Sequence, residues 1–149
     1  MKAIIQRVTK GTVTVKDEIV GRVGKGFVVF LGVGHEDNEE DARYLAKKIS
    51  GMRIFEDNQG KMNLSLDQVA GGVLVISQFT LYGDTRKGNR PSFVGAAPPE
   101  QANRLYEYFI ALIKEAGIPT ESGIFQAEMQ VEIYNDGPVT LVIESKKGD

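Results

Sequence analysis

The 149-residue sequence lacks cysteine and contains a single histidine, His35. The absence of cysteine excludes disulfides, thiolate nucleophiles and thiolate metal sites. A serine nucleophile needs an imidazole or another base within hydrogen-bond reach, and no Gly-x-Ser-x-Gly elbow surrounds Ser77. His35 follows an apolar run without any partner motif, so we expect a surface loop residue there. A site in this chain must therefore use backbone groups, hydroxyls and amides.

Metal and cofactor motifs are also missing from the sequence. No His, Cys or carboxylate cluster has the spacing of a zinc site, and the acidic run 39–41 suits the start of a helix better. The pair Gly32 and Gly34 lacks the third glycine of a dinucleotide fingerprint and precedes acidic residues that repel a pyrophosphate. The sequence therefore predicts neither a metal nor an organic cofactor.

Net charge and apolar runs set further limits. The formal net charge is −2, which argues against a protein that coats nucleic acid, so any contact with RNA or DNA must be local. No apolar run reaches membrane-spanning length, and polar residues interrupt the amino-terminal segment too early for a signal peptide. We expect one domain over residues 1–149, in a soluble and cytoplasmic protein without a membrane or DNA partner.

The most informative stretch covers residues 73–82. It begins as an unbroken run of aliphatic residues, typical of a strand that is buried on both faces, and turns polar at Ser77, Gln78 and Thr80. A central strand that ends in hydroxyl and amide groups places fixed polar side chains at the rim of a sheet, where sites are often built. Alternatively, the serine and threonine only satisfy neighbouring backbone groups at a strand end.

The remaining elements predict an α+β fold. Asp37 and Glu40 have the spacing of a capping box before a helix that ends at Gly51, and Pro98–Pro99 begins a second helix that stops at Gly117. Strands are expected at residues 2–8, 12–16, 19–23, 27–33, 53–56, 122–125, 129–134 and 139–144. We therefore expect a curled, largely antiparallel β-sheet or barrel with two main helices packed on it.

Residues 135–140 join the last two expected strands. Their Asp-Gly and Gly-Pro pairs are strong turn and breaker signals, which favour an ordinary hairpin loop with a trans Gly-Pro bond. A second interpretation is that Gly137 and Pro138 present bare carbonyls to a ligand, because glycine permits close approach and proline lacks an N–H.

The motifs at residues 77–80 and 135–140 together resemble the two signatures of the D-aminoacyl-tRNA deacylase family, of the D-tyrosyl-tRNA deacylase type. Further similar segments lie in the same order along almost the whole chain, at residues 5–8, 31–33, 53–55, 60–64, 87–93 and 105–106. One departure is Gln126, where the family usually has a small residue, and a side chain facing the substrate there would narrow the pocket.

The resemblance implies a homodimeric enzyme with its site at the subunit interface. Its partner is the tRNA acceptor end, and it hydrolyses the ester that joins a D-amino acid, or glycine mischarged on other tRNAs, to the terminal adenosine. The family carries its Gly-Pro bond as cis and inserts it into the other subunit's site. Carried onto this chain, the carbonyls of Gly137 and Pro138 would face the substrate ammonium, and the side chain of an L-residue would clash with that backbone.

The resemblance also assigns residues. Ser77, Gln78, Phe79 and Thr80 form the catalytic segment, in which backbone N–H groups near Phe79 and Thr80 stabilise an oxyanion. The expected substrate-binding residues are Gly137, Pro138, Phe125, Met129 and Arg7, and the expected tRNA-binding residues are Arg86, Lys87 and Arg90. The alternatives are ordinary core residues for Phe125 and Met129, a salt bridge for Arg7, and solvated loop charges for the last three.

Two other functions remain open from the sequence. A non-catalytic β-domain that binds RNA ends or metabolites would have the same pocket and break no bond. A general small-ester hydrolase would cleave a simple D-aminoacyl ester about as well as the tRNA substrate.

Overall fold

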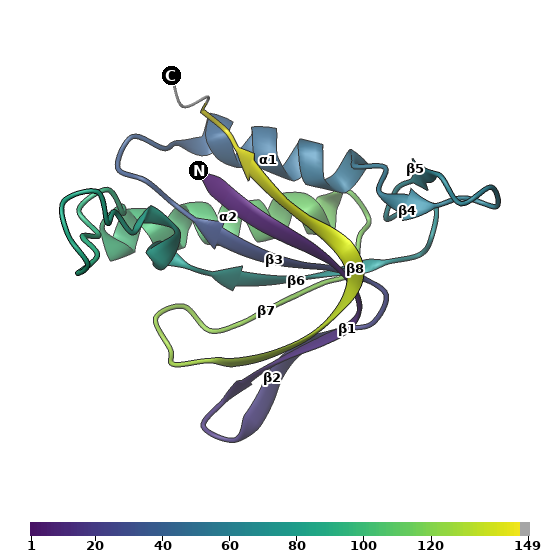
Figure 1. The fold of residues 1–149 in the computed structure, drawn as a ribbon, viewed down its shortest axis with the longest axis horizontal. Helices are drawn as coiled ribbons and strands as arrows, with labels where there is room; N and C mark the ends of the chain where they lie inside the picture. The colour runs from purple at the N-terminus through teal and green to yellow at the C-terminus, as the bar shows by residue number, and fades with distance from the viewer. Residues whose placement is uncertain (147–149) are drawn as a thin grey trace.

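A computed structural model describes residues 1–146 of the chain (Figure 1). The strands are β1 (Lys2–Val15), β2 (Glu18–Val23), β3 (Gly26–Gly32), β4 (Phe55–Glu56), β5 (Met62–Leu64), β6 (Gly72–Ser77), β7 (Thr120–Ser122) and β8 (Gln130–Glu144). The helices are α1 (Glu39–Gly51) and α2 (Pro99–Glu115), and a 3₁₀ turn, η1 (Phe79–Tyr82), follows β6. Among the residues described, no helix is long and apolar enough to cross a membrane.

The main sheet is mixed and curls almost into a barrel. Its strand order is β2-β1-β3-β6-β7, and β8 also pairs with β1. β1 runs antiparallel to β2, β3 and β8, whereas β3–β6 and β6–β7 are parallel pairs. The two ends of the sheet approach each other, since the N–H of Arg22 in β2 donates to Glu121 Oε1 in β7 at 2.9 Å. The predicted α+β class and curled sheet with two helices are confirmed.

The parallel pairs arise from two helical crossovers. α1 lies between β3 and β6 in the chain, and α2 lies between β6 and β7, so each parallel pair has the helix that such a connection needs. The two helices pack against each other and against the same face of the sheet (Figure 1). This arrangement brings the carboxyl ends of β3 and β6 to the same edge of the sheet.

Strand β6 is buried on both faces, as its sequence predicts. Val73 and Val75 pack into the core beneath the helices, while Leu74 and Ile76 pack into a second core enclosed by the curled sheet. All four side chains are at most 1% exposed. β6 therefore separates two apolar cores, and its polar end lies where both of them stop.

The helix boundaries follow local signals with one correction. α2 begins at a proline pair, as predicted. The capping box of α1, however, is formed by Asn38 and Asp41 rather than by Asp37 and Glu40. Asn38 has the extended backbone of an N-cap and accepts from the N–H of Glu40, so Asp37 is left free for a different partner.

The prediction of a hairpin loop at residues 135–140 is wrong. β8 is one long strand that stays paired with β1 across this region, because β1 itself continues through Gly11 to Val15. Gln6 pairs with Thr140 and Val8 with Asn135, so residues 136–139 loop out of the ladder opposite Arg7. We refer to residues 136–139 as the β8 bulge.

The close parallel pairing of β3 with β6 depends on Gly26. A Cβ atom added there would lie 2.7 Å from the backbone nitrogen of Gly72 and closer still to its carbonyl oxygen. We expect Gly26→Ala to lower the free energy of unfolding by about 3 kcal/mol or more, because the backbones of two core strands must separate. Urea unfolding measures this change. Gly24→Ala is the matched control, since no atom lies within 4 Å of its added Cβ, and an equal loss there would contradict the explanation.

Candidate functional site

A cavity of about 740 Å³ opens where β3 and β6 end. Open α/β sheets commonly bind ligands at the carboxyl ends of parallel strands, where loops of different elements converge. The lining is mostly apolar, with four polar side chains among it. The lining residues are Val33, His35, Ile76, Ser77, Gln78, Phe79, Phe93, Ala96, Ala97, Pro98, Pro99, Ala102, Phe125, Gln126, Ala127, Met129 and Val131.

One wall is formed by the end of β6 and the 3₁₀ turn that follows it. The N–H of Gln78 donates to the Leu31 carbonyl at 2.8 Å, which fixes the turn to the end of β3. Among the residues that the structure describes, the N–H groups of Phe79 and Thr80 have no hydrogen-bond acceptor, as expected for the first residues of a helical turn. The turn therefore carries two unused backbone donors, that of Phe79 in the cavity lining and that of Thr80 one residue further along the chain.

The predicted catalytic residues do not all face the cavity. Ser77, Gln78 and Phe79 line it, whereas Thr80 does not. The Thr80 hydroxyl accepts a hydrogen bond from the Gln78 amide. The Phe79 side chain is 57% exposed and meets Phe93 edge to face, with ring centroids 5.2 Å apart. Phe93 comes from a loop without sequence periodicity, and although it ends the segment 87–93 that carries the family resemblance, nothing in that segment predicted its place at the cavity.

A second part of the lining comes from the segment between β7 and β8. Phe125 and Met129, which were predicted to bind substrate, line the cavity, and each also packs against one of the two apolar cores. The Phe125 ring lies 6.0 Å from that of Tyr106 in α2, whose hydroxyl donates to the Val75 carbonyl at 3.2 Å. Their packing against the cores is therefore compatible with a place at the cavity, and substrate binding by these two residues stays a prediction.

Gly137 and Pro138 lie in the β8 bulge, outside the residues that line the cavity of the same chain. Both are exposed, and their peptide bond is cis. The Asn135 amide braces the base of the bulge by donating to the carbonyls of Arg7 and Val139, at 2.9 and 3.1 Å. A ligand in the cavity therefore does not meet this motif within one chain.

Arg7 is 3% exposed and sits behind the bulge. Its Nη1 donates to the Ile54 carbonyl at 2.7 Å, and its Nε lies 3.1 Å from Asp136 Oδ2, an ion pair that lacks hydrogen-bond geometry. The structure thus pairs Arg7 with the residue before Gly137, rather than with a carbonyl of Gly137 or Pro138 in the same chain.

The predicted tRNA-binding residues lie in an exposed loop outside the cavity lining. Arg86 is paired with Asp84, since its Nη2 lies 2.7 Å from Asp84 Oδ2. The hydrogen bonds from the Arg86 side chain and backbone lower the pKa of Asp84 to about 2. Lys87 and Arg90 form no ion pair within the described part of the chain, which leaves them as the accessible cations of this loop.

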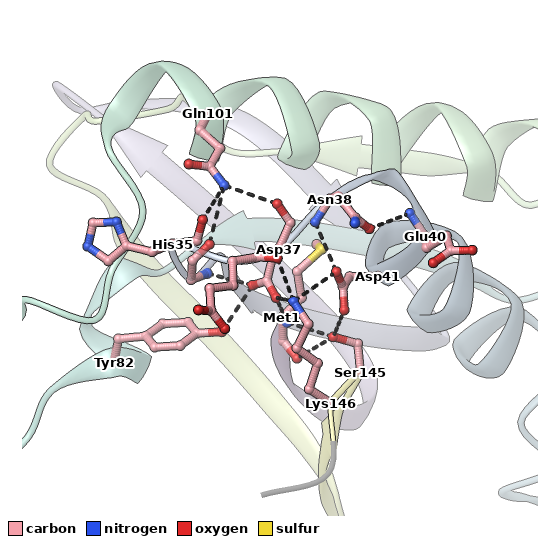
Figure 2. Close-up of polar contacts among 12 residues, drawn as sticks. Met1, His35, Asp37, Asn38, Glu40, Asp41, Tyr82, Gln101, Ser145 and Lys146 are labelled. Atoms are coloured by element: carbon pink, nitrogen blue, oxygen red, sulfur yellow. Dashed lines mark hydrogen bonds and ion pairs between the residues drawn. The ribbon is translucent and has the colours of Figure 1, made fainter.

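A buried polar cluster supports the cavity wall that carries Val33 and His35 (Figure 2). The Met1 ammonium lies 2.7 Å from Asp37 Oδ1, and Asp37 Oδ2 accepts from the Gly34 N–H at 2.6 Å. From α2, the Gln101 amide donates to the carbonyls of His35 and Asp37, both at 3.0 Å. This support could not be predicted from local sequence patterns, because its members come from distant parts of the chain.

His35 is exposed, as predicted, although it also lines the cavity. Its Nε2 lies 2.6 Å from the Val94 carbonyl oxygen. A carbonyl only accepts, so this nitrogen carries the proton of the hydrogen bond. The contact ties the loop after β3 to the loop that precedes α2.

The cluster extends to Asp41 and the end of β8 (Figure 2). Ser145 Oγ donates to Asp41 Oδ1 at 2.7 Å, and Lys146 Nζ lies 3.3 Å from Asp41 Oδ2. Burial acts to raise the pKa of Asp41, but the hydrogen bonds from Ser145, the Asn38 backbone and Lys146 outweigh it and lower that pKa below 3.8. Burial and the nearby Asp37 carboxylate raise the pKa of the Tyr82 phenol, which stays protonated and contacts Asp37.

Comparison with known sequences identifies related proteins over nearly the full length. A sequence model described as D-Tyr-tRNA(Tyr) deacylase matches residues 4–144. The D-aminoacyl-tRNA deacylase of Fervidobacterium nodosum is 60% identical over 147 residues, 99% of each chain. The D-aminoacyl-tRNA deacylase of Desulforamulus reducens is 58% identical over 148 residues, also 99% of each chain.

Solved structures agree with this relation. The structure of a c-Myc DNA Unwinding Element Binding Protein superposes with a TM-score of 0.91 at 40% identity, over 99% of this chain and 100% of that one. A probable eukaryotic D-amino acid tRNA deacylase superposes with a TM-score of 0.83 at 19% identity, over 96% of this chain and 98% of that one. The second likeness concerns the fold alone.

Because the pKa of Asp41 is lowered in the folded protein, the contribution of this carboxylate to stability depends on pH. That contribution is fully present above the unfolded value of 3.8 and is lost as the pH falls through the lower folded value. We expect Asp41→Asn to reduce the free energy of unfolding at pH 7 by about 1–3 kcal/mol, because hydrogen bonds to a charged group are lost. Denaturant titrations between pH 7 and pH 2 should show a shallower decline below pH 4 in the variant, and equal slopes would contradict the assignment.

Proposed function

Because this chain belongs to the D-Tyr-tRNA(Tyr) deacylase family, we propose that it hydrolyses the ester of D-aminoacyl-tRNA and releases the free D-amino acid and tRNA. The observation that carries the proposal is the family match over residues 4–144, with the motif at residues 77–80 at the wall of the main cavity. The cytoplasm, where charged tRNA is made, is the compartment that we propose.

The ester needs little help from side chains. Its carbonyl carbon is attacked by water, and the neighbouring ribose hydroxyl of the RNA assists that water. The negative charge that develops on the carbonyl oxygen is stabilised by the N–H groups of Phe79 and Thr80, which have no other acceptor among the described residues. Collapse of the tetrahedral species breaks the bond to the ribose oxygen, which takes up the proton that the attacking water gave up and leaves as the tRNA hydroxyl. No side chain forms a covalent intermediate.

Rejection of L-residues is assigned to Gly137 and Pro138 of a second copy of the chain. Their exposure outside the cavity lining of their own chain supports this arrangement. The same strand exposes Tyr134, Leu141 and Val142, apolar surface that a homodimer would cover. In the proposed dimer the side chain of a D-amino acid points away from the β8 bulge, whereas that of an L-amino acid collides with the bulge. Glycine has no side chain and is therefore accepted.

The acceptor end of the tRNA is held by few charges. Lys87 and Arg90 are the accessible cations of the exposed loop, and Arg86 can exchange Asp84 for a phosphate. Contacts with so few phosphates give a shallow dependence of affinity on salt. That property suits a protein whose formal net charge is −2.

The first test compares two esters on the same tRNA. We expect D-tyrosyl-tRNA to be hydrolysed at least a hundredfold faster than L-tyrosyl-tRNA, because a backbone clash of about 3 kcal/mol or more is sufficient for that ratio. Glycyl-tRNA should also be hydrolysed, because it carries no side chain. Release of labelled amino acid from each substrate measures the rates.

The rival functions give different results in this assay. A domain that only binds RNA ends or metabolites leaves all three esters intact. A general esterase cleaves D-tyrosine methyl ester about as well as D-tyrosyl-tRNA. Equal hydrolysis of the D- and L-esters would disprove the proposed selectivity while leaving the hydrolase activity in place.

The second test separates the hydroxyl of Thr80 from its backbone N–H. We expect Thr80→Ala to retain kcat within about tenfold, since the hydroxyl lies outside the cavity lining and accepts from Gln78. Replacement of Thr80 by its α-hydroxy acid analogue converts the amide into an ester and removes only the N–H. That change should reduce kcat by about 10²–10³, the usual cost of an oxyanion donor.

Single-turnover hydrolysis and equilibrium binding of the substrate distinguish the outcomes. Loss of hydrolysis in Thr80→Ala with binding and fold unchanged would show that the hydroxyl has a direct chemical role. Full activity of the variant with the α-hydroxy acid analogue at Thr80 would show that the N–H of Thr80 does not stabilise the oxyanion.

A further inference from the structure

We infer that Gln126 is a specificity-determining residue whose side-chain amide reads the edge of the terminal adenine of the tRNA. This inference rests on the proposed function, because it takes the aminoacyl end of a tRNA as the ligand. It is carried by three features of Gln126: its place in the cavity lining, its backbone conformation and its unoccupied amide.

The backbone of Gln126 is unusual for a residue with a side chain. The N–H of Ala127 donates to the Ile124 carbonyl at 3.2 Å, which closes a turn over residues 124–127. Gln126 is the third residue of this turn and has a φ of +66°, a conformation that favours glycine. A residue held in this region at a pocket wall points to a role for its side chain that outweighs the conformational cost.

The cavity around Gln126 suits a flat base. Three aromatic rings line the same cavity, those of Phe79 and Phe93, which meet edge to face, and that of Phe125. Bases that are not paired in a helix are bound by proteins through stacking on such rings, with hydrogen bonds made at the base edge. The mostly apolar lining therefore supplies the stacking surface, and the base edge needs polar partners.

Gln126 is the cavity amide that is available for this purpose. The other amide of the lining, Gln78, donates to the Thr80 hydroxyl, whereas Gln126 makes no hydrogen bond within residues 1–146. A glutamine amide matches adenine, because its oxygen accepts from the exocyclic N6 amine while its nitrogen donates to N7. The exposed side chain of Gln126 is free to adopt that geometry.

The decisive experiment replaces one nitrogen of the base with carbon. A tRNA that ends in 7-deazaadenosine lacks the N7 acceptor and keeps the ring, the N6 amine and the ester. We expect the wild-type protein to hydrolyse D-tyrosyl-tRNA that ends in 7-deazaadenosine with a kcat/KM about tenfold lower than that for natural D-tyrosyl-tRNA. This factor corresponds to about 1.4 kcal/mol. In Gln126→Ala the two substrates should be hydrolysed equally, at or below the rate of the wild type with the deaza substrate, because the variant also loses the contact with N6.

Gln126→Gly provides the matched control for folding. Glycine suits a φ of +66°, so this variant should be at least as stable as the wild type and should likewise ignore the base change. An equal deaza penalty in the wild type and both variants, or no penalty in the wild type, would overturn the assignment and leave the proposed hydrolase function intact. Absence of hydrolysis of natural D-tyrosyl-tRNA would overturn the proposed function as well.

Discussion

The backbone hydrogen bonds of β1 hold this molecule together, because one strand pairs with three others. β1 runs beside β3 over its first half and beside β2 over its second half, while β8 follows it on the other side along most of its length. Gly11 permits this continuity, since a Cβ atom there would lie 2.8 Å from the Val28 side chain. The curl of the sheet, and with it the separation into two cores, depends on this one long strand.

The site depends on the same architecture through the parallel strands. β3 and β6 end side by side, so the loop with Val33 and His35 and the turn with Phe79 share one cavity. The Met1 ammonium and the Asp37 carboxylate secure the first of these loops from behind. Rigid strand ends and a buried ion pair thus fix the backbone, which suits a site whose proposed donors are backbone N–H groups.

The sequence predicts those parts of the fold and of the cavity whose signals are local. The proline pair before α2 and the two-sided apolar run of β6 predicted those elements correctly, and the polar end of β6 pointed to the cavity. The hairpin predicted at residues 135–140 failed because pairing with β1 overrides the turn signal of the Asp-Gly pair, which is accommodated in the β8 bulge. Turn propensity is a local quantity, whereas a bulge is decided by the strand opposite.

Other parts of the site had no local signal at all. Asp37 looked like a helix cap, and its true partners, Met1 and Lys146, lie at distant points of the chain. Phe93 reaches the cavity from a segment without periodicity, so only the folded loop places it there. Whether a residue beside a motif lines the cavity, as Gln126 does and Thr80 does not, is set by a turn conformation that composition does not reveal.

The pairing of β1 with β8 also determines when the protein can fold during its synthesis. Lys2 leaves the ribosome well before its partner Glu144, which emerges only after the intervening chain has been made. The edge of β1 that belongs to β8 is therefore unpaired until β8 has emerged, and until then it is an open template for another strand. Closure of the sheet has to wait for β8, and contacts between segments so far apart in sequence are slow to form.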